Sequence, residues 1–318
     1  MVQLMGLRIV FMGTPRFAVA SLDRLYHSRH EVVAVVTAPD KPAGRGRKHL
    51  QSEVKKYALQ KGLELLQPPR LKSQDFIAEL KAVKADLQVV VAFRMLPRVV
   101  WAMPTAGTLN LHASLLPQYR GAAPIHWAII NGETETGVTT FFIDENIDAG
   151  AVLMREKVPI TQAENAGELH DKLMLLGADL VLKTVQAIED KTLSPKAQPR
   201  VAVCKTAPKI YRETRRLNWN DTAKSLFDKI RGLSPDPTAW TMLTDGQTQC
   251  PIKIFKAERI AVQSRSKPGS LVLEKKAIRV ATRDEWLSIL EVQAAGKRKM
   301  GAADFLNGVH LNKAFCLK

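Results

Sequence analysis

The chain has 318 residues, more than the roughly 100 to 150 residues of a common single domain, so two domains are expected. Its residues are 46% hydrophobic, enough for a sizeable core, yet no apolar run approaches the roughly 18 residues that cross a bilayer, which excludes a helical membrane protein. The 3 cysteines are far apart in sequence, which fits neither a disulfide framework nor a zinc knuckle and indicates a reducing, cytoplasmic compartment.

The net charge of +16 is uneven along the chain, because residues 200–318 hold 23 basic but only 11 acidic side chains. Such an excess indicates a polyanionic partner, and the C-terminal third is where contact is expected. The alternative is that the charge only keeps a basic enzyme in solution.

The N-terminal half alternates apolar strands with helices. Continuous apolar runs, typical of a parallel sheet covered on both faces, predict strands at residues 7–12, 31–36 and 87–93. Helices are expected after the turn at Gly13, at 52–61 and at 76–83. This order predicts a doubly wound α/β domain. The lone glycine of the first turn does not match the dinucleotide fingerprint, which disfavours NAD binding.

Residues 39–48 hold two prolines, two glycines and four basic residues, so no regular element is expected there. A flexible basic loop of this kind can order against phosphates. The alternative is a solvated surface loop, and the residues alone favour that alternative.

The stretch from Asn110 to Asp148 is interpreted as an acyl-transfer site. Asn110 and His112 are two residues apart at an expected strand end, so their side chains project to one face. An amide donor beside an imidazole can meet a developing oxyanion. Asp148 follows an apolar run, where its carboxylate can orient the imidazole. The three residues form a proton-handling group, in which the formal base stays open.

The segment Ser114-Leu-Leu-Pro117 follows this strand directly. Its backbone could bond a pterin-like ring while its leucines pack on the ring; the alternative is an ordinary loop ended by proline. Pro124 starts a helix, on which His126 is interpreted as a structural or surface histidine and not as a second catalytic one. A zinc site of His112, His126 and Asp148 lacks the usual ligand spacing, and no metal is expected.

A long helix is expected over residues 166–188, followed by an aperiodic, proline-containing linker. Beyond it, residues 222–231 are helical in pattern and 234–240 form a rigid turn. Short alternating strands at 252–255, 271–273, 278–280 and 286–292 predict a small antiparallel barrel such as the OB-fold. Its basic face has six candidates: Lys253, Lys256, Arg259, Lys297, Arg298 and Lys299.

Four motifs lie around the expected site: Asn110-x-His112, Ser114-Leu-Leu-Pro117, Tyr119-Arg-Gly-Ala-Ala-Pro-Ile125 and Asp148 ahead of Gly150. Together they resemble the signature of the folate-dependent formyltransferases, and among these the members that act on methionyl-tRNA. The resemblance is strong over residues 7–150 and weak after residue 210. One departure is Gln118, which stands where that family usually has arginine.

The resemblance implies a Rossmann-like formyltransferase catalytic domain at residues 1–191, a linker at 192–210 and an OB-like tRNA-binding domain at 211–318. It implies a monomeric enzyme of translation initiation that needs no metal. The enzyme would move the formyl group of its cosubstrate 10-formyltetrahydrofolate onto the α-amine of initiator methionyl-tRNA.

The resemblance also implies roles for particular residues. Catalysis is assigned to Asn110, His112 and Asp148. Tetrahydrofolate binding is assigned to Ser114, Leu115, Leu116 and Pro117. Contact with the tRNA acceptor end is assigned to Arg45, with Arg47 and Lys48 behind it.

Three rival functions share some of these features. A formyltransferase acting on glycinamide ribonucleotide or on a nucleotide-linked amino sugar keeps the Asn-x-His and Asp residues, but the first lacks a basic second domain and the second usually lacks the Pro-Ala-Gly-Arg-Gly run. A hydrolase could release formate from the same cosubstrate. A non-catalytic RNA-binding module would explain the charge but not the three site residues.

Overall fold

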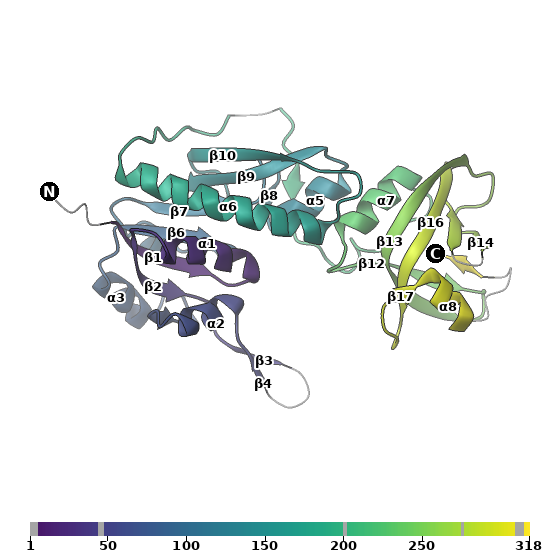
Figure 1. Cartoon of the computed structure of the whole chain (residues 1–318), viewed down its shortest axis with the longest axis horizontal. Coiled ribbons are helices and arrows are strands. Elements are labelled where there is room, and N and C mark those ends of the chain that lie inside the picture. Colours follow the sequence, from purple (N-terminus) through teal and green to yellow (C-terminus); the bar gives the residue numbers. More distant parts are fainter. Residues whose placement is uncertain (1–5, 44–47, 200–201, 275–276, 309–314) are drawn as a thin grey trace. The chain divides into compact units, whose positions relative to one another are not determined.

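The computed structural model describes residues 6–43, 48–199, 202–274, 277–308 and 315–318. The chain divides into two compact units (Figure 1). The first comprises Met1–Gly121, Thr136–Val158 and His170–Thr206, and the second comprises Ala122–Glu135, Pro159–Leu169 and Ala207–Lys318. Two short segments that interrupt the first unit, Ala122–Glu135 and Pro159–Leu169, therefore belong to the second unit. The domain boundaries at residues 191 and 210 stay a prediction.

The first unit is built on a seven-stranded sheet of order β10-β9-β7-β6-β1-β2-β5. Its parallel strands are β1 (Arg8–Gly13), β2 (Glu31–Val36), β5 (Leu65–Leu66), β6 (Leu87–Val91) and β7 (Thr108–His112). The sheet continues through β9 (Glu135–Phe142), antiparallel to β7, and β10 (Val152–Pro159). Strand order reverses between β1 and β6, as in a doubly wound sheet, which confirms the predicted fold class.

The continuous apolar runs form strands because both faces of this sheet are covered. Residues Ile9 to Met12 of β1 are 0% exposed, and every residue of β6 is buried. The helices are α1 (Arg16–Tyr26), α2 (Glu53–Gln60), α3 (Gln74–Ala82), α4 (Arg98–Trp101) and α6 (Ala166–Glu189). The Ser52 hydroxyl caps α2 by accepting a hydrogen bond from the Lys55 N–H at 3.0 Å.

Helix α6 lies along one face of the sheet (Figure 1). A Cβ added at Gly177 would come within 2.7 Å of Leu111 Cδ2, so glycine allows the helix to approach β7 closely. About two helical turns further along α6, the Thr184 hydroxyl lies 2.9 Å from the Thr140 hydroxyl of β9. Leu111 and Thr140 are cross-strand partners, so α6 covers the face to which both point.

A buried histidine precedes β2. The side chain of His30 is 0% exposed, and its Nδ1 accepts a hydrogen bond from the Leu7 N–H at 3.3 Å. Nδ1 is therefore the lone-pair nitrogen of a neutral ring, and Nε2 has no partner among the described residues. Burial lowers the pKa of His30 below 6.5, and nearby Glu189 opposes this shift only in part.

This histidine should make the protein less stable in mild acid. Because the unfolded chain protonates His30 near pH 6.5 and the folded chain resists it, stability is lost as pH falls from about 6.5 towards the folded pKa. His30→Asn offers an amide oxygen to the Leu7 N–H without titrating. We expect the melting temperature of the wild type to fall more steeply than that of the variant between about pH 7.5 and 5 in calorimetry. Parallel curves would contradict the prediction.

The second unit is an antiparallel sheet of order β14-β15-β16-β13-β12-β18, with β17 paired to β16. Its strands are β12 (Ala239–Thr244), β13 (Gln249–Gln263), β14 (Leu271–Leu273), β15 (Ile278–Ala281), β16 (Glu285–Ala294), β17 (Met300–Gly301) and β18 (Cys316–Leu317). The ends of the sheet approach closure, because Ser270 bridges Cys316 and the Leu317 N–H donates to Gly269 O at 2.9 Å. This nearly closed barrel confirms the predicted OB-like domain.

Helices complete the second unit. They are α5 (Pro124–Ile130), α7 (Ala223–Gly232) and α8 (Ala302–Gly308). Leu226 and Ile230 of α7 share a buried core with strand residues such as Ile254 and Leu287. The turn predicted at residues 234–240 ends sooner than expected, since β12 begins at Ala239. No helix in the described part of the chain is long and apolar enough to cross a membrane.

Residues 39–48 also differ from expectation. Lys41–Ala43 forms β3 and Lys48–Leu50 forms β4, and the two strands pair antiparallel. The prediction of a wholly irregular segment is therefore wrong at its flanks. Both strands of such a ribbon are edge strands, which tolerate a proline such as Pro42 where its N–H side faces solvent.

Candidate active site

Strand β7 presents Asn110 and His112 to the face of the sheet that α6 does not cover. The intervening Leu111 contacts α6, and side chains alternate along a strand, so Asn110 and His112 point the other way. His112 is 6% exposed, whereas Asn110 is half-buried. The predicted juxtaposition of an amide and an imidazole is present.

The loop after β7 is fastened over this same face by Thr139, the cross-strand partner of His112. Its hydroxyl donates to Ser114 O at 2.6 Å and accepts from the Leu116 N–H at 3.2 Å. Leu116 is 1% exposed and packs with Phe141 and Val152. The loop therefore has a fixed backbone on the catalytic face of the strand.

The four residues predicted to bind tetrahydrofolate are unequal. Ser114, Leu116 and Pro117 are buried, and the Ser114 hydroxyl donates to Gln118 O at 2.6 Å. Leu115 is half-buried and is the member of the four with a side chain partly open to solvent. A ligand at this segment would meet backbone atoms and Leu115, and the assignment stays a prediction.

The imidazole of His112 has one nitrogen committed to the protein. Nε2 lies 2.8 Å from Tyr119 O, and because a carbonyl can only accept, Nε2 carries the hydrogen. Nδ1 faces the Asp148 carboxylate, 3.7 Å from Oδ2. Nδ1 is then a lone pair in the neutral ring and an N–H in the charged ring. It is the nitrogen through which His112 can move a proton.

Asp148 is held in an unusual conformation. Its φ is +53°, in the left-handed region that side-chain-bearing residues rarely adopt. Oδ2 accepts a hydrogen bond from the Gly121 N–H at 2.9 Å, and the side chain is 14% exposed. Two residues on, a Cβ at Gly150 would lie 1.7 Å from Phe142 O, so only glycine fits there. The carboxylate is fixed beside His112 by its own backbone and by the loop.

Asn110 offers a free donor. Within the described part of the chain its side-chain amide has no hydrogen-bond partner, although it is half-buried. A half-buried amide next to a His–Asp pair, with its donors not used by a described residue, can donate to negative charge that appears during a reaction. The three predicted catalytic residues thus come together, and their catalytic roles stay a prediction.

The segment expected to be a linker contacts this site, which the sequence did not indicate. Gln118 donates through its side-chain amide to Val203 O at 3.2 Å and accepts from the Lys205 N–H at 2.8 Å. The Tyr119 N–H donates to Lys205 O at 2.6 Å, and the Cys204 thiol donates to Pro117 O at 3.0 Å. Residues 203–205 therefore hold the loop in addition to Thr139, through hydrogen bonds to Pro117, Gln118 and Tyr119.

One further residue near Asp148, Gln198, was missed as a part of the site. Gln198 donates to the backbone oxygens of Asp148 and Gly150, and Arg120 donates to the Gln198 side chain. These contacts join residues far apart in sequence through backbone carbonyls, which leave no motif.

Other predicted positions lie elsewhere. Arg45 and Arg47 fall outside the described residues, and Lys48 begins β4. His126 lies on α5, where its Nδ1 is 2.8 Å from Gly232 O, as expected for a structural histidine. Over the ranges that the structure describes, no three His, Cys, Asp or Glu side chains gather as metal ligands.

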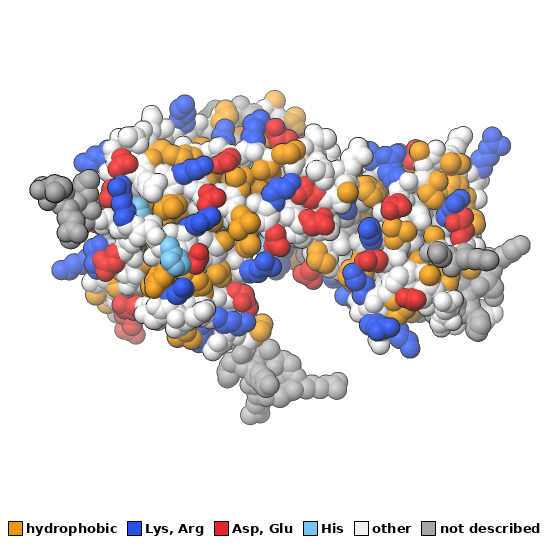
Figure 2. Space-filling view, in the orientation of Figure 1, with side chains coloured by type: hydrophobic (Ala, Val, Ile, Leu, Met, Phe, Trp, Pro, Cys, Tyr) orange, Lys and Arg blue, Asp and Glu red, His pale blue; other side chains and the backbone are white. Residues whose placement is uncertain are grey.

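The basic candidates of the barrel are exposed. On β13, Lys253, Lys256 and Arg259 are all exposed, and the buried residues Ile252, Ile254 and Ala257 lie beside the two lysines. Two of the six candidates form ion pairs, Arg259 with Glu285 and Lys299 with Glu291, each at 2.8 Å. Figure 2 shows Lys and Arg interspersed with Asp and Glu on the visible face of each unit. Their contact with tRNA stays a prediction.

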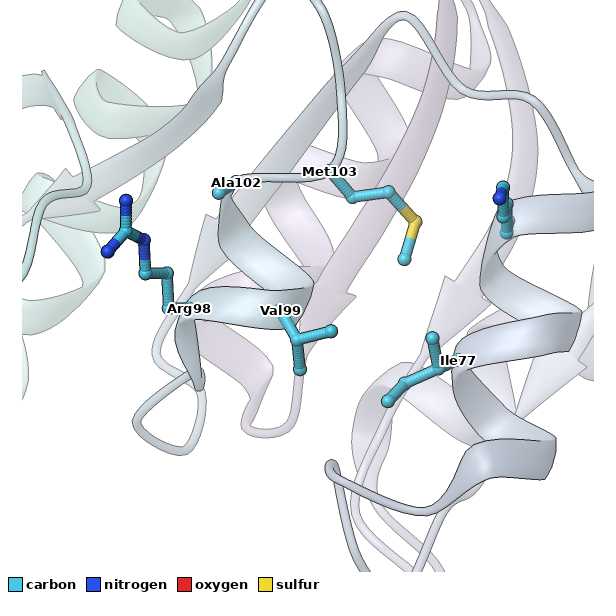
Figure 3. Close-up of a pocket in the computed structure, with 6 residues that line it drawn as sticks. Ile77, Arg98, Val99, Ala102 and Met103 are labelled. Atoms are coloured by element: carbon cyan, nitrogen blue, oxygen red, sulfur yellow. The ribbon is translucent and has the colours of Figure 1, made fainter.

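An apolar depression lies between α3 and α4 (Figure 3). It is lined by Ile77, Lys81, Arg98, Val99, Ala102 and Met103. Val99 and Ile77 point towards one another across it, whereas Arg98 points away, where it pairs with Glu145 at 3.2 Å. None of the predicted site residues lines this depression.

Comparison with known proteins agrees with the geometry. Residues 7–185 match the family model "Formyl transferase", and residues 209–310 match "Formyl transferase, C-terminal domain". Methionyl-tRNA formyltransferase of Bacteroides thetaiotaomicron is 51% identical over 314 residues, covering 97% of this chain and 98% of that protein. The chain belongs to the methionyl-tRNA formyltransferase family. A family member from Azobacteroides pseudotrichonymphae is 53% identical over 310 residues, covering 95% of each chain.

Solved structures share the fold of this family member at low identity. HypX from Aquifex aeolicus, in complex with tetrahydrofolic acid, is 24% identical with a TM-score of 0.63 and covers 95% of this chain and 47% of HypX. An N-formyltransferase from Helicobacter canadensis, in complex with folinic acid and dTDP-3-aminofucose, is 19% identical with a TM-score of 0.60. That match covers 91% of this chain and 99% of the other.

Proposed function

We propose that this chain transfers the formyl group of 10-formyltetrahydrofolate to the α-amine of methionine esterified to initiator tRNA, giving N-formylmethionyl-tRNA for translation initiation. The observation that carries the proposal is the group on one face of β7. The Asn110 amide, which has no hydrogen-bond partner among the described residues, lies beside His112, and Asp148 Oδ2 lies 3.7 Å from His112 Nδ1. The proposal is also supported by relatives that are named methionyl-tRNA formyltransferase and are about half identical to this chain over nearly its whole length.

The chemistry proceeds without a covalent enzyme intermediate. The free amine attacks the formyl carbon, and the carbonyl oxygen becomes an oxyanion. The Asn110 amide donates to that oxygen. When the tetrahedral intermediate collapses, the bond from carbon to N10 of the folate breaks, N10 gains a proton, and the attacking nitrogen loses one.

His112 takes part in this reaction through Nδ1, because its Nε2 already donates a hydrogen bond to Tyr119 O. As imidazolium, the ring presents an Nδ1–H to the oxyanion and a positive charge beside it. As a neutral ring, it presents a lone pair that accepts the proton of the attacking amine. Whether His112 donates or accepts the proton first, the Asp148 carboxylate supplies the negative charge that stabilises its imidazolium form.

The substrates are bound by three further regions in this proposal. The segment Ser114–Pro117 holds the pterin ring, and the basic residues Arg45, Arg47 and Lys48 contact the acceptor end of the tRNA. The basic face of the barrel adds phosphate contacts. The enzyme acts as a monomer in the cytoplasm, and its own residues carry the reaction without a metal.

The direct test is formyl transfer from 10-formyltetrahydrofolate with three acceptors: charged initiator tRNA, free methionine and glycinamide ribonucleotide. We expect only the charged tRNA to be formylated. Because phosphate contacts release counterions, kcat/KM for tRNA should fall at least roughly tenfold between 50 and 200 mM salt. Equal or better formylation of a small acceptor would overturn the tRNA assignment while leaving the acyl-transfer chemistry standing.

A further inference from the structure

The side-chain amide of Gln198 is fully used at the edge of the site. Its Nε2 donates to Asp148 O at 2.8 Å and to Gly150 O at 2.9 Å. Its Oε1 accepts from Arg120 Nη2 at 2.6 Å and from Arg120 Nε at 3.2 Å. Two donated and two accepted hydrogen bonds satisfy every polar group of the amide.

The orientation of this amide is fixed by chemistry. A guanidinium only donates and a backbone carbonyl only accepts, so Oε1 must face Arg120 and Nε2 must face the two carbonyls. Arg120 therefore determines which end of Gln198 meets the turn. A glutamate here would keep the size and the Arg120 contact but would bring no N–H to the carbonyls.

The turn that Gln198 grips is the one that sets the Asp148 carboxylate. Asp148 has a φ of +53°, which is unfavourable for a residue with a Cβ. Gly150 is confined by Phe142, since any Cβ there would meet Phe142 O at 1.7 Å. The two hydrogen bonds from Gln198 to the carbonyls of residues 148 and 150 form a clamp that opposes relaxation of this backbone. The clamp thereby also opposes movement of Asp148 Oδ2 away from His112.

We propose that Gln198 is a positioning residue for formyl transfer: it clamps the 148–150 turn so that the Asp148 carboxylate stays beside His112 Nδ1. The inference rests on the proposed function, because the placement of Asp148 matters through that chemistry. Gln198 touches no predicted catalytic side chain and acts through backbone oxygens. The segment between α6 and β11 (Thr206–Ala207) thereby contributes a positioning side chain, that of Gln198, to the site.

The test compares Gln198→Met with Gln198→Glu. Both variants keep the length of the side chain and lose the two N–H donors. Because displacement of a catalytic group by about 1 Å can cost about 100-fold, we expect kcat to fall about 10- to 100-fold in both, with KM for each substrate within about twofold. A residue needed only for packing would tolerate glutamate. Wild-type kcat in Gln198→Glu overturns the proposal.

Gln293→Met is the matched control. Gln293 is half-buried like Gln198, and its amide also donates to a backbone carbonyl, that of Lys297 at 2.8 Å. It lies on β16, outside the clamp. Unchanged kcat is expected for this variant, and a loss equal to that of Gln198→Met would overturn the assignment.

A double-mutant cycle with Asp148→Asn identifies the route of the effect. If Gln198 acts by placing the carboxylate, Gln198→Met should cost no more than about twofold once that charge is gone. A full loss in the Asp148→Asn background overturns the proposal. If Gln198→Met does not fold, as judged by its melting temperature, the Gln198→Glu arm of the cycle decides. Failure of the wild type to formylate charged tRNA would count against the proposed function, whereas an active wild type with an unimpaired Gln198→Glu counts against the clamp.

Discussion

Replacing His112 with alanine should lower kcat for formylation of charged tRNA by roughly 100-fold or more, with little change in either KM. The variant removes the Nδ1 that faces Asp148. In the proposed mechanism it also removes the group that stabilises the oxyanion beside Asn110. Asn110→Ala removes the other donor and should cost roughly 100-fold by the same reasoning. Single-turnover kinetics with saturating substrates separates these losses from weaker binding.

A second histidine supplies the control for this experiment. His27, at the end of α1, lies 3.4 Å from the Asp23 carboxylate, a His–Asp pair much like that of the site but 57% exposed. His27→Ala should leave kcat unchanged. Near-normal turnover in His112→Ala would remove His112 from the mechanism, and the Asn110 amide would then be the remaining donor.

The parallel strands of the fold were predictable because burial on both faces demands continuous apolar runs. Residues 7–12, 31–36 and 87–93 carry such runs and form β1, β2 and β6. Strand β10 gave no such signal: in Val152–Pro159 burial alternates with exposure, and three charged residues interrupt the strand. An edge strand with one open face lacks the composition by which the central strands were recognised.

The barrel shows the same limit in another form. The prolines at 235 and 237 correctly predicted a turn, but they hid how soon β12 begins at Ala239. Strand β13 runs for 15 residues with several register shifts against β16, so its alternation is interrupted and only the part near residues 252–255 was recognisable. Bulges displace the period-two pattern on which strand prediction depends.

The site was predictable to the extent that its residues follow strand periodicity. Asn110 and His112 are two residues apart on β7, and this spacing alone placed them on one face. Gln198 is 50 residues from Asp148 in sequence and binds it through a backbone oxygen. Any residue type presents such an oxygen, so the partner carries no signal. The segment after α6 looks like a linker for this reason.

The second large effect is expected for Asp148→Asn, which should lower kcat roughly 100- to 1,000-fold while leaving the fold intact. Asparagine has the size of aspartate and is among the residues that best tolerate a left-handed backbone, so the φ of +53° can persist. In the wild type the Gly121 N–H donates to Asp148 Oδ2 at 2.9 Å, and the amide oxygen of asparagine can accept the same hydrogen bond. What is lost is the negative charge facing His112.

This substitution therefore separates charge from shape. The melting temperature should stay within a few degrees of the wild type, whereas Asp148→Ala loses the Gly121 hydrogen bond as well and should also be less stable. Asp171→Asn is the control, because Asp171 lies 3.0 Å from His170 Nδ1 on the exposed surface of α6 and should be dispensable. If Asp148→Asn kept kcat within about twofold while Asp148→Ala lost it, Asp148 would act through its hydrogen bond to Gly121, and the imidazolium of His112 would need no counter-charge.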